Sequence, residues 1–241
     1  MRKIVVGDIC GDVDLLKQLF DQLSITSDDY ILFTGSYLGP GPDSKATLDY
    51  LIDFQQKHPK CDFLRGCYEH TFEQIISDQG WRDRHLQALW KAMGGSKVFQ
   101  SYAKVDEISV AMPEGKIERV RMPFIIPEPH IRFLEKNLHL WYMDHEDPFV
   151  VFHAGPDTKN FMNPRSENVL IGEKDWWLTD FEIPGQRIIF SHVPFNVPFR
   201  DKHGKRGIDL GCGRGMDKLC AYIADQDDFV VAAKTISGRV N

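Results

Sequence analysis

The sequence predicts an α/β fold, in which short buried strands alternate with amphipathic helices around a largely parallel sheet. Three observations lead to this prediction. β-Branched runs near the N-terminus end at glycine or polar residues, segments with apolar residues at helical spacing follow them, and strand-like segments return later in the chain. With 241 residues, of which 42% are hydrophobic, the chain can bury a substantial core, and we expect residues 1–241 to form a single domain.

The N-terminal elements follow a strand–helix–strand order. Ile4–Val6 is a β-branched run closed by a glycine, and Val13–Leu23 carries leucines and a phenylalanine at helical spacing. Tyr30–Phe33 and Asp62–Leu64 are short apolar runs that we expect to be buried strands. Between them we expect a helix with Ser44 as its N-cap, because serine is favoured at that position. The loops after these strands lie where open α/β sheets bind ligands.

The middle of the chain, Thr71–Asn137, is predicted to be mostly helical. Within it, Met112–Arg121 is polar and contains a proline and a glycine, which predicts a surface loop. The later part is predicted to return to strands, and the expected ones are Trp141–Met143, Phe149–Phe152, Arg187–Phe190, Gly207–Leu210 and Leu219–Ala224.

Composition and charge bear on whether the protein binds nucleic acids or membranes and on its compartment. The net charge is −6 and no long basic run occurs, so we expect no nucleic-acid partner, because phosphate backbones are held by clustered lysines and arginines. No stretch approaches the ~18–20 apolar residues that a membrane span needs. The N-terminus lacks the pattern of a signal peptide, and five cysteines form no compact disulfide framework. We therefore expect a cytoplasmic protein.

Five short segments in a fixed order carry a resemblance to a known family. They are Gly7–Asp12, Gly35–Ser44, Arg65–Glu69, His153–Gly155 and Ser191–Pro194. This series resembles the calcineurin-like metallophosphoesterases, whose patterns read GDxHG, GDxVDRGPDS, RGNHE, HAG and GHTP. Within that family it is most similar to the serine/threonine phosphatases and the symmetrical diadenosine-tetraphosphate hydrolases. The resemblance implies a sandwich of two mixed sheets flanked by helices.

The resemblance also implies a two-metal site, yet several of the metal-ligand positions carry other residues. Asp8, His153 and His192 match metal ligands of the family. Cys10 stands where the first metal takes a histidine, and Cys67 stands where the second metal takes an asparagine. Thiolates and imidazoles together suit one tetrahedral Zn²⁺ ion.

The remaining catalytic positions are replaced as well. Ser36 stands at the bridging carboxylate, and Tyr68 stands at the histidine that protonates the leaving group. Gly39 replaces the aspartate that orients this histidine, and Pro40 replaces the phosphate-binding arginine. A neutral serine does not offset the repulsion between two dications, and proline offers no donor to phosphate. We therefore expect no dinuclear centre.

Two interpretations of the pocket stay open at this stage. In one, Asp8, Cys10, Cys67, His153 and His192 converge on a single Zn²⁺ or Mn²⁺ ion. In the other the site has decayed and binds no metal, and both cysteines are small buried apolar residues. Ser36 is a candidate binding residue, and so is Arg214, which either contacts an anion or is an ordinary solvated arginine.

Three functions are therefore compatible with the sequence. The leading hypothesis is a catalytically impaired relative, a pseudophosphatase that binds a protein partner or a phosphorylated ligand. The alternatives are an active phosphoesterase with an atypical mononuclear site, acting on phosphoproteins or dinucleotide polyphosphates, and a structural interaction protein. A fold alone does not decide among them.

Overall fold

The structure is a computed structural model that describes residues 1–77, 79–103, 125–161, 163 and 166–234. Its larger sheet has six strands in the order β11-β10-β1-β2-β3-β4. Strands β1 to β4 run parallel, whereas β10 and β11 are antiparallel to their neighbours. The strands span β1 Lys3–Val6, β2 Tyr30–Phe33, β3 Cys61–Leu64, β4 Leu138–His139, β10 Lys218–Ile223 and β11 Asp228–Ala233.

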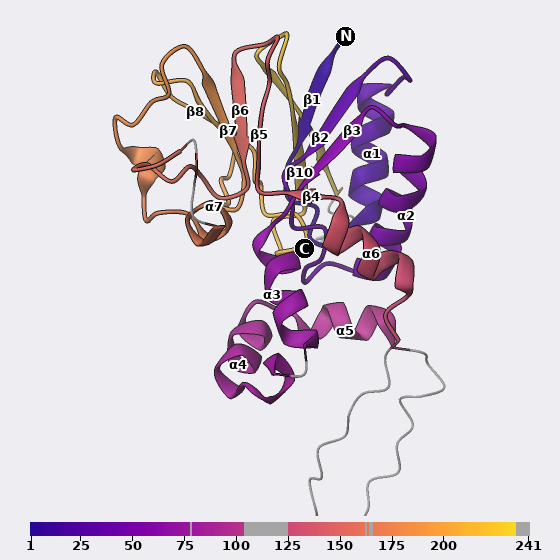
Figure 1. Cartoon of the computed structure of the whole chain (residues 1–241). Coiled ribbons are helices and arrows are strands. Elements are labelled where there is room, and N and C mark those ends of the chain that lie inside the picture. The colour runs from indigo at the N-terminus through magenta and orange to yellow at the C-terminus, as the bar shows by residue number, and fades with distance from the viewer. Residues whose placement is uncertain (78, 104–124, 162, 164–165, 235–241) are drawn as a thin grey trace, which may run out of the picture.

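The second sheet has five strands in the order β5-β6-β7-β9-β8 and faces the first sheet (Figure 1). Its three central strands, β6, β7 and β9, are parallel, and an antiparallel strand closes each edge. The strands span β5 Trp141–Met143, β6 Phe149–Phe152, β7 Arg187–Phe190, β8 Phe199–Arg200 and β9 Lys205–Gly207. The observed architecture is the predicted sandwich of two mixed sheets.

Alternation along the strands divides the core into three layers. Val5 of β1 and Ile189 of β7 point between the sheets and share one hydrophobic cluster. Their neighbours point outward, so that Ile4 packs under the helices beside the first sheet and Ile188 packs behind the second. Because side chains of a strand point alternately to its two faces, strands that are apolar throughout must be covered on both sides.

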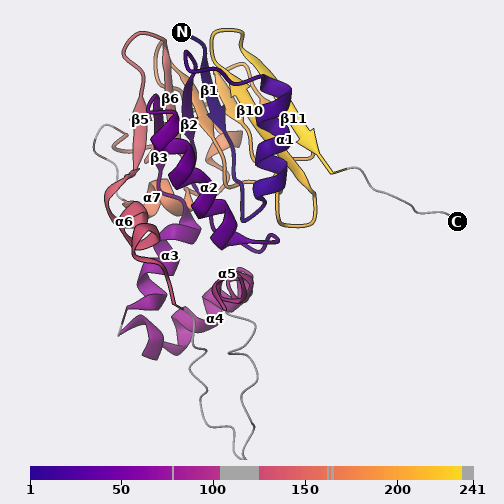
Figure 2. The same ribbon diagram turned by 90° about the vertical axis from the view of Figure 1, so that its right-hand side faces the viewer.

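The helices cover the outer face of the first sheet and one edge of both sheets. Helices α1 and α2 lie against the outer face, and α3, α4 and α5 lie beyond the edge to which the parallel strands point (Figures 1 and 2). The α-helices span α1 Val13–Leu23, α2 Ser44–Lys57, α3 Cys67–Ile76, α4 Arg84–Ala92, α5 Ser96–Tyr102, α6 Glu128–Lys136 and α7 Ser166–Ile171. Short 3₁₀ turns occupy η1 Gly80–Arg82 and η3 Trp176–Leu178.

Most predicted elements are confirmed, with two corrections. Asp43, not Ser44, is the N-cap of α2, because its carboxylate accepts a hydrogen bond from the Ala46 N–H at 2.9 Å. The expected strand at Gly207–Leu210 is wrong in its position, since β9 ends at Gly207 and the residues after it form a loop. The predicted loop at Met112–Arg121 lies outside the described residues.

The described helices are all too short or too polar to cross a membrane.

Candidate functional site

Loops after five strands, β1, β2, β3, β6 and β7, meet at one edge of the sandwich and form the candidate site. Asp8 follows β1, Ser36 follows β2 and Cys67 opens α3 after β3. From the second sheet, His153 follows β6 and His192 follows β7. The carboxyl ends of the central parallel strands in both sheets lie at this edge, which is why residues far apart in the sequence come together here.

Three of the predicted metal ligands form a compact group. Cys67, His153 and His192 each offer one ligand atom, and these atoms all lie within 4.8 Å of one another. We call these three residues the cysteine–histidine group. Ser36 adjoins it, because its Oγ lies 3.4 Å from Nε2 of His153 and 3.9 Å from Sγ of Cys67. One thiol and two imidazoles are a donor set that fits a single Zn²⁺ or a similar divalent transition metal.

The hydrogen bonds of His153 leave one ring nitrogen available to a metal. Its Nδ1–H donates to the carbonyl oxygen of Thr34 at 2.9 Å, which fixes the ring and leaves the lone pair on Nε2. Complete burial lowers the pKa of His153 to about 4, so the ring is neutral near pH 7. Neutral imidazole is the form that binds metals.

His192 is the second imidazole of the group. The centroids of the His192 and His153 rings lie 5.2 Å apart, and the two rings meet edge to face. Burial and the nearby His153 lower the pKa of His192 to about 3, so this ring is neutral too. Nδ1 of His192 is buried and has no hydrogen-bond partner among the described residues. A buried nitrogen without a partner is costly, and a metal ion at this place would satisfy it.

Asp8, the remaining matched ligand, is engaged by the protein itself. It is 1% exposed, and its Oδ1 accepts a short hydrogen bond from the hydroxyl of Ser191. Its Oδ2 faces Nη2 of Arg214 at 3.6 Å. Burial raises the pKa of Asp8 above its usual value, while the charge of Arg214 and the hydroxyl of Ser191 oppose that effect.

Arg214 is not an ordinary solvated arginine. Its side chain is 23% exposed, and the same Nη2 donates a short hydrogen bond to Oδ2 of the fully buried Asp209. Burial also raises the pKa of Asp209, and Arg214 counteracts part of that rise. We call Asp8, Ser191, Asp209 and Arg214 the carboxylate–arginine cluster.

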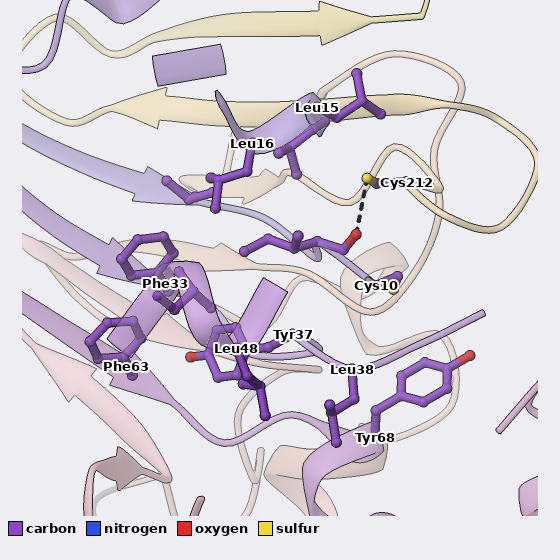
Figure 3. Close-up of a cluster of buried hydrophobic side chains, with 14 of the residues drawn as sticks. Cys10, Leu15, Leu16, Phe33, Tyr37, Leu38, Leu48, Phe63, Tyr68 and Cys212 are labelled. Carbon is purple, nitrogen blue, oxygen red and sulfur yellow. Dashed lines mark hydrogen bonds between the residues drawn. The ribbon is translucent and has the colours of Figure 1, made fainter. Parts of the chain in front are cut away.

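Cys10 is not part of the cysteine–histidine group and packs among apolar side chains, with Arg214 and Asp8 near enough to act on its thiol. It is completely buried in the same hydrophobic cluster as Leu38 and Tyr68 (Figure 3). A Cβ on Gly39 would meet the Cα of Cys10 at 2.6 Å, so the two loops are in close backbone contact. Burial raises the pKa of the Cys10 thiol well above its usual range, which keeps it protonated.

Tyr68 and Pro40, which stand at the positions of the family's general acid and phosphate-binding arginine, make packing contacts in this structure. The Tyr68 hydroxyl donates to the carbonyl oxygen of Met93 at 2.6 Å, and burial raises the pKa of Tyr68 above its usual value. A Cβ on Gly94 would come within 2.7 Å of the Pro40 Cβ, so the turn between α4 and α5 lies against this proline. Tyr68 and Pro40 therefore both contact the same turn.

Glu69 shapes the loop that carries Ser36. Its buried carboxylate accepts hydrogen bonds from the backbone N–H groups of Ser36, Tyr37, Leu38 and Gly66 at 2.8–3.0 Å. Ser36 adopts the left-handed region with φ of 53°, as do Cys10 at 49° and His192 at 68°. Non-glycine residues in this region are strained and cluster at functional sites, and the carboxylate of Glu69 helps to hold one of them.

The structure thus brings Cys67, His153 and His192 together and places Ser36 beside them. Asp8 and Cys10 do not join this group among the described residues. Sequence reasoning did not identify Ser191, Asp209 and Glu69 as site residues. Ser191 gave one available signal, because it stands where the family pattern GHTP has glycine. The five cysteines are all free.

The fold and the order of these loops define a metallophosphoesterase-type protein, and comparison with known families agrees. The sequence profile of the calcineurin-like phosphoesterases matches residues 1–196. The chain therefore belongs to the calcineurin-like phosphoesterase family.

Solved structures with the same fold include several phosphatases. A protein assigned as a diadenosine tetraphosphatase is 16% identical with a TM-score of 0.68, over 98% of this chain and 95% of that chain. A serine/threonine phosphatase from Saccharomyces cerevisiae with similarity to human phosphatase PP5 is 14% identical with a TM-score of 0.55, over 100% and 82%. A metallophosphoesterase from Sphaerobacter thermophilus is 12% identical with a TM-score of 0.52, over 98% and 89%. At these identities the likeness shows the fold alone.

Proposed function

We propose that this protein is a pseudophosphatase that binds a phosphorylated ligand through a single metal ion and does not hydrolyse it efficiently. Cys67, His153 and His192 would hold the ion. A divalent transition metal in this place would supply a Lewis-acidic centre that attracts a phosphoryl oxygen. The pocket would keep the binding half of phosphoesterase chemistry and lack the groups that complete the reaction.

The observation that carries this proposal is the role of Tyr68 and Pro40 as packing residues. A general acid must reach the leaving group, but the Tyr68 hydroxyl already donates to the Met93 carbonyl. Pro40 has no donor, and its side chain lies against Gly94. General acid catalysis contributes roughly 10²–10⁴-fold in rate, so its loss together with the clamp supports very slow hydrolysis.

Charge in the pocket supports a metal-dependent ligand. Asp8 and Asp209 share the single cation Arg214, while His153 and His192 are neutral. Without a metal the pocket therefore offers no unpaired positive charge to a phosphate group. A bound dication would supply one, so the phosphorylated ligand should bind only to the metal-loaded protein.

The cysteine–histidine group also favours a second candidate, an active phosphoesterase with a mononuclear site. A Cys-His-His set leaves one tetrahedral position open, which is the arrangement of catalytic rather than structural zinc sites. The structural interaction protein is the third candidate and requires neither metal nor phosphate. The five free thiols support the proposed cytoplasmic location, where disulfides are rare.

Metal content, ligand binding and turnover separate the three candidates. Protein purified without a metal-affinity tag should contain up to one equivalent of a divalent transition metal by elemental analysis. Calorimetry should show binding of tungstate, a phosphate analogue, to the zinc-loaded protein and none after chelation. Hydrolysis of p-nitrophenyl phosphate, phosphopeptides and diadenosine tetraphosphate should be negligible with added Zn²⁺ or Mn²⁺.

Two results would reject the pseudophosphatase. Turnover in the common enzyme range of ~1–10³ s⁻¹ that His153→Ala abolishes would identify the active mononuclear phosphoesterase instead. Failure to bind any metal or tungstate would leave the structural interaction protein. His145→Ala serves as the matched control, because this exposed histidine lies between β5 and β6.

A further inference from the structure

Two buried carboxylates at the site require a positive charge. Asp8 is 1% exposed and Asp209 is 0% exposed, and they follow strands of different sheets, β1 and β9. Removing an ionised carboxylate from water is strongly unfavourable unless an opposite charge or several hydrogen bonds compensate it. In the resembled family a metal ion meets the aspartate at the position of Asp8.

Arg214 supplies that charge from within the chain. One nitrogen atom, Nη2, donates to Oδ2 of Asp209 and lies 3.6 Å from Oδ2 of Asp8. The guanidinium therefore lies between the two carboxylates and serves both. Its charge is permanent near neutral pH, because the guanidinium of arginine does not lose its proton in proteins.

Ser191 satisfies the other oxygen of Asp8. Its hydroxyl donates to Oδ1 and also accepts from the Asp8 backbone N–H at 3.2 Å. Oδ1 of Asp8 is therefore hydrogen-bonded to Ser191, whereas Oδ2 has no hydrogen bond among the described residues and faces the charge of Arg214 at 3.6 Å. Ser191 stands at the glycine position of GHTP, so this hydrogen bond depends on the replacement.

The first metal position of the family does not fit an ion in this chain. The Asp8 carboxylate is committed to Ser191 and Arg214, and Cys10 lies in an apolar cluster against Gly39. A dication beside the guanidinium would meet a like charge at close range in a buried place, where water does little to screen the repulsion. The available ligand atoms and the charge of Arg214 therefore both disfavour a metal ion at this position.

We infer that Arg214 is a built-in cation that replaces the first metal ion, and that it keeps Asp8 and Asp209 from binding a divalent cation. This inference does not rest on the proposed function, because it holds whether or not Cys67, His153 and His192 bind a metal. It assigns Arg214 to internal charge compensation, so this residue contributes no free positive charge to a bound phosphate.

Counting bound Mn²⁺ ions tests the inference. Electron paramagnetic resonance titrations would compare the wild-type protein with Arg214→Gln, which removes the charge, and Arg214→Lys, which keeps it. Arg214→Gln should bind one more ion than wild type, and Arg214→Lys should bind no more than wild type. Arg132→Gln, a change at an exposed arginine of α6, is the matched control and should leave the count unchanged.

A further variant locates the gained ion. Adding Asp8→Asn to Arg214→Gln should return the count to that of the wild type. If Arg214→Gln does not fold, the Asp209→Asn/Arg214→Gln double variant takes its place with the same expectations, because it buries one charge fewer.

An unchanged count in the folded, uncharged variant would overturn the inference, and so would an equal gain in Arg214→Lys. A wild-type count of zero would contradict the proposed single-metal site, yet the difference between variants would still decide the role of Arg214. The wild-type count therefore tests the proposed function, and the difference between the variants tests the role of Arg214.

Discussion

The carboxylate–arginine cluster and the cysteine–histidine group lie next to each other, and they differ in how their polar atoms are satisfied. His153 links them, since its Nδ1 lies 3.7 Å from Oδ1 of Asp8. In the cluster, the charges of Asp8 and Asp209 are met by Arg214. Buried atoms without a hydrogen bond among the described residues occur in both, namely Oδ2 of Asp8 and Nε of Arg214 in the cluster and Nδ1 of His192 in the group. The difference is one of charge: the carboxylates of the cluster, the closed half, have a cation within the protein, whereas the ligand atoms of the group, the open half, have none.

This difference shows that neighbouring parts of one site can meet the needs of their polar groups in different ways. In the closed half, Ser191 and Arg214 contact Asp8. The open half presents one thiol and two imidazoles, from Cys67, His153 and His192. Softer donors at the open half favour transition metals over Mg²⁺ or Ca²⁺. The comparison predicts that substitutions in the closed half lower stability and leave the metal affinity of the open half nearly unchanged, whereas substitutions in the open half lower that affinity.

The largest expected effect is the loss of stability on removing the charge of Arg214. Arg214→Met leaves Asp8 and Asp209 buried without their cation, and breaking such a buried pair costs about 3–5 kcal/mol. Cys67→Ala in the open half should cost less than about 1.5 kcal/mol in metal-free protein, because Cys67 packs only partly buried at the side of the core and its hydrogen bond to Ser36 is long, at 3.9 Å. Denaturant unfolding in the presence of a chelator measures both.

The deficit of Arg214→Met should shrink in acid. Burial raises the pKa of both Asp8 and Asp209, so in the variant their folded-state pKa lies above the unfolded value of about 4. The folded variant then binds more protons than the unfolded chain, and its stability rises as pH falls from neutral toward about 4. A deficit that is constant from pH 7 to about 4.5 would show that charge is not its cause.

The next effect concerns metal affinity and should be confined to the open half. His192→Ala removes a ligand atom and should weaken Zn²⁺ binding by more than ~100-fold, since even indirect partners of ligands account for about 10–100-fold. Asp8→Asn should change the affinity by less than about 10-fold, because Asp8 is held by Ser191 and Arg214. Competition with a chromophoric chelator gives both values, and equal losses would contradict the division into halves.

A smaller effect is expected at Glu69, which serves the loop between the halves. Glu69→Gln replaces one carboxylate oxygen by an NH₂ group that faces backbone N–H donors, and we expect a loss of about 1–3 kcal/mol. Glu73→Gln, one turn further along α3, is the control, because Glu73 pairs with Arg65 at a partly exposed position. A larger loss of stability in Glu73→Gln than in Glu69→Gln would show that the Glu69 carboxylate does not shape the loop.

The fold could be predicted from the sequence because its signals are local. Strands such as Tyr30–Phe33 and the helix Val13–Leu23 are set by short-range periodicity, and the order of the five motifs fixed the family. The N-cap of α2 was missed by one residue, since Asp43 and Ser44 are both good capping residues. Only the geometry shows that the Ser44 hydroxyl donates to the Gly39 carbonyl instead.

The site could be predicted only in part, for a physical reason. Cys67, His153 and His192 follow strands whose ends converge, so their meeting follows from topology. Arg214 and Asp8 lie on the loops after β9 and β1, and whether their side chains meet depends on how these two loops pack. No spacing in the sequence records that contact. Motif comparison therefore could not predict that Asp8 lies beside Arg214.

The smallest effect is expected at Tyr68, where the hydroxyl donates to the Met93 carbonyl at 2.6 Å. Tyr68→Phe keeps the edge-on contact with Trp90 and loses one hydrogen bond, so stability should fall by about 1 kcal/mol. Tyr102→Phe is the matched control, because that buried hydroxyl also makes a single hydrogen bond, to His130. If Tyr68 were a proton donor, its replacement would lower any residual hydrolysis by roughly 10²–10⁴-fold. We expect instead that both variants retain the same residual rate, because the Tyr68 hydroxyl already donates its proton to the Met93 carbonyl in the turn before α5.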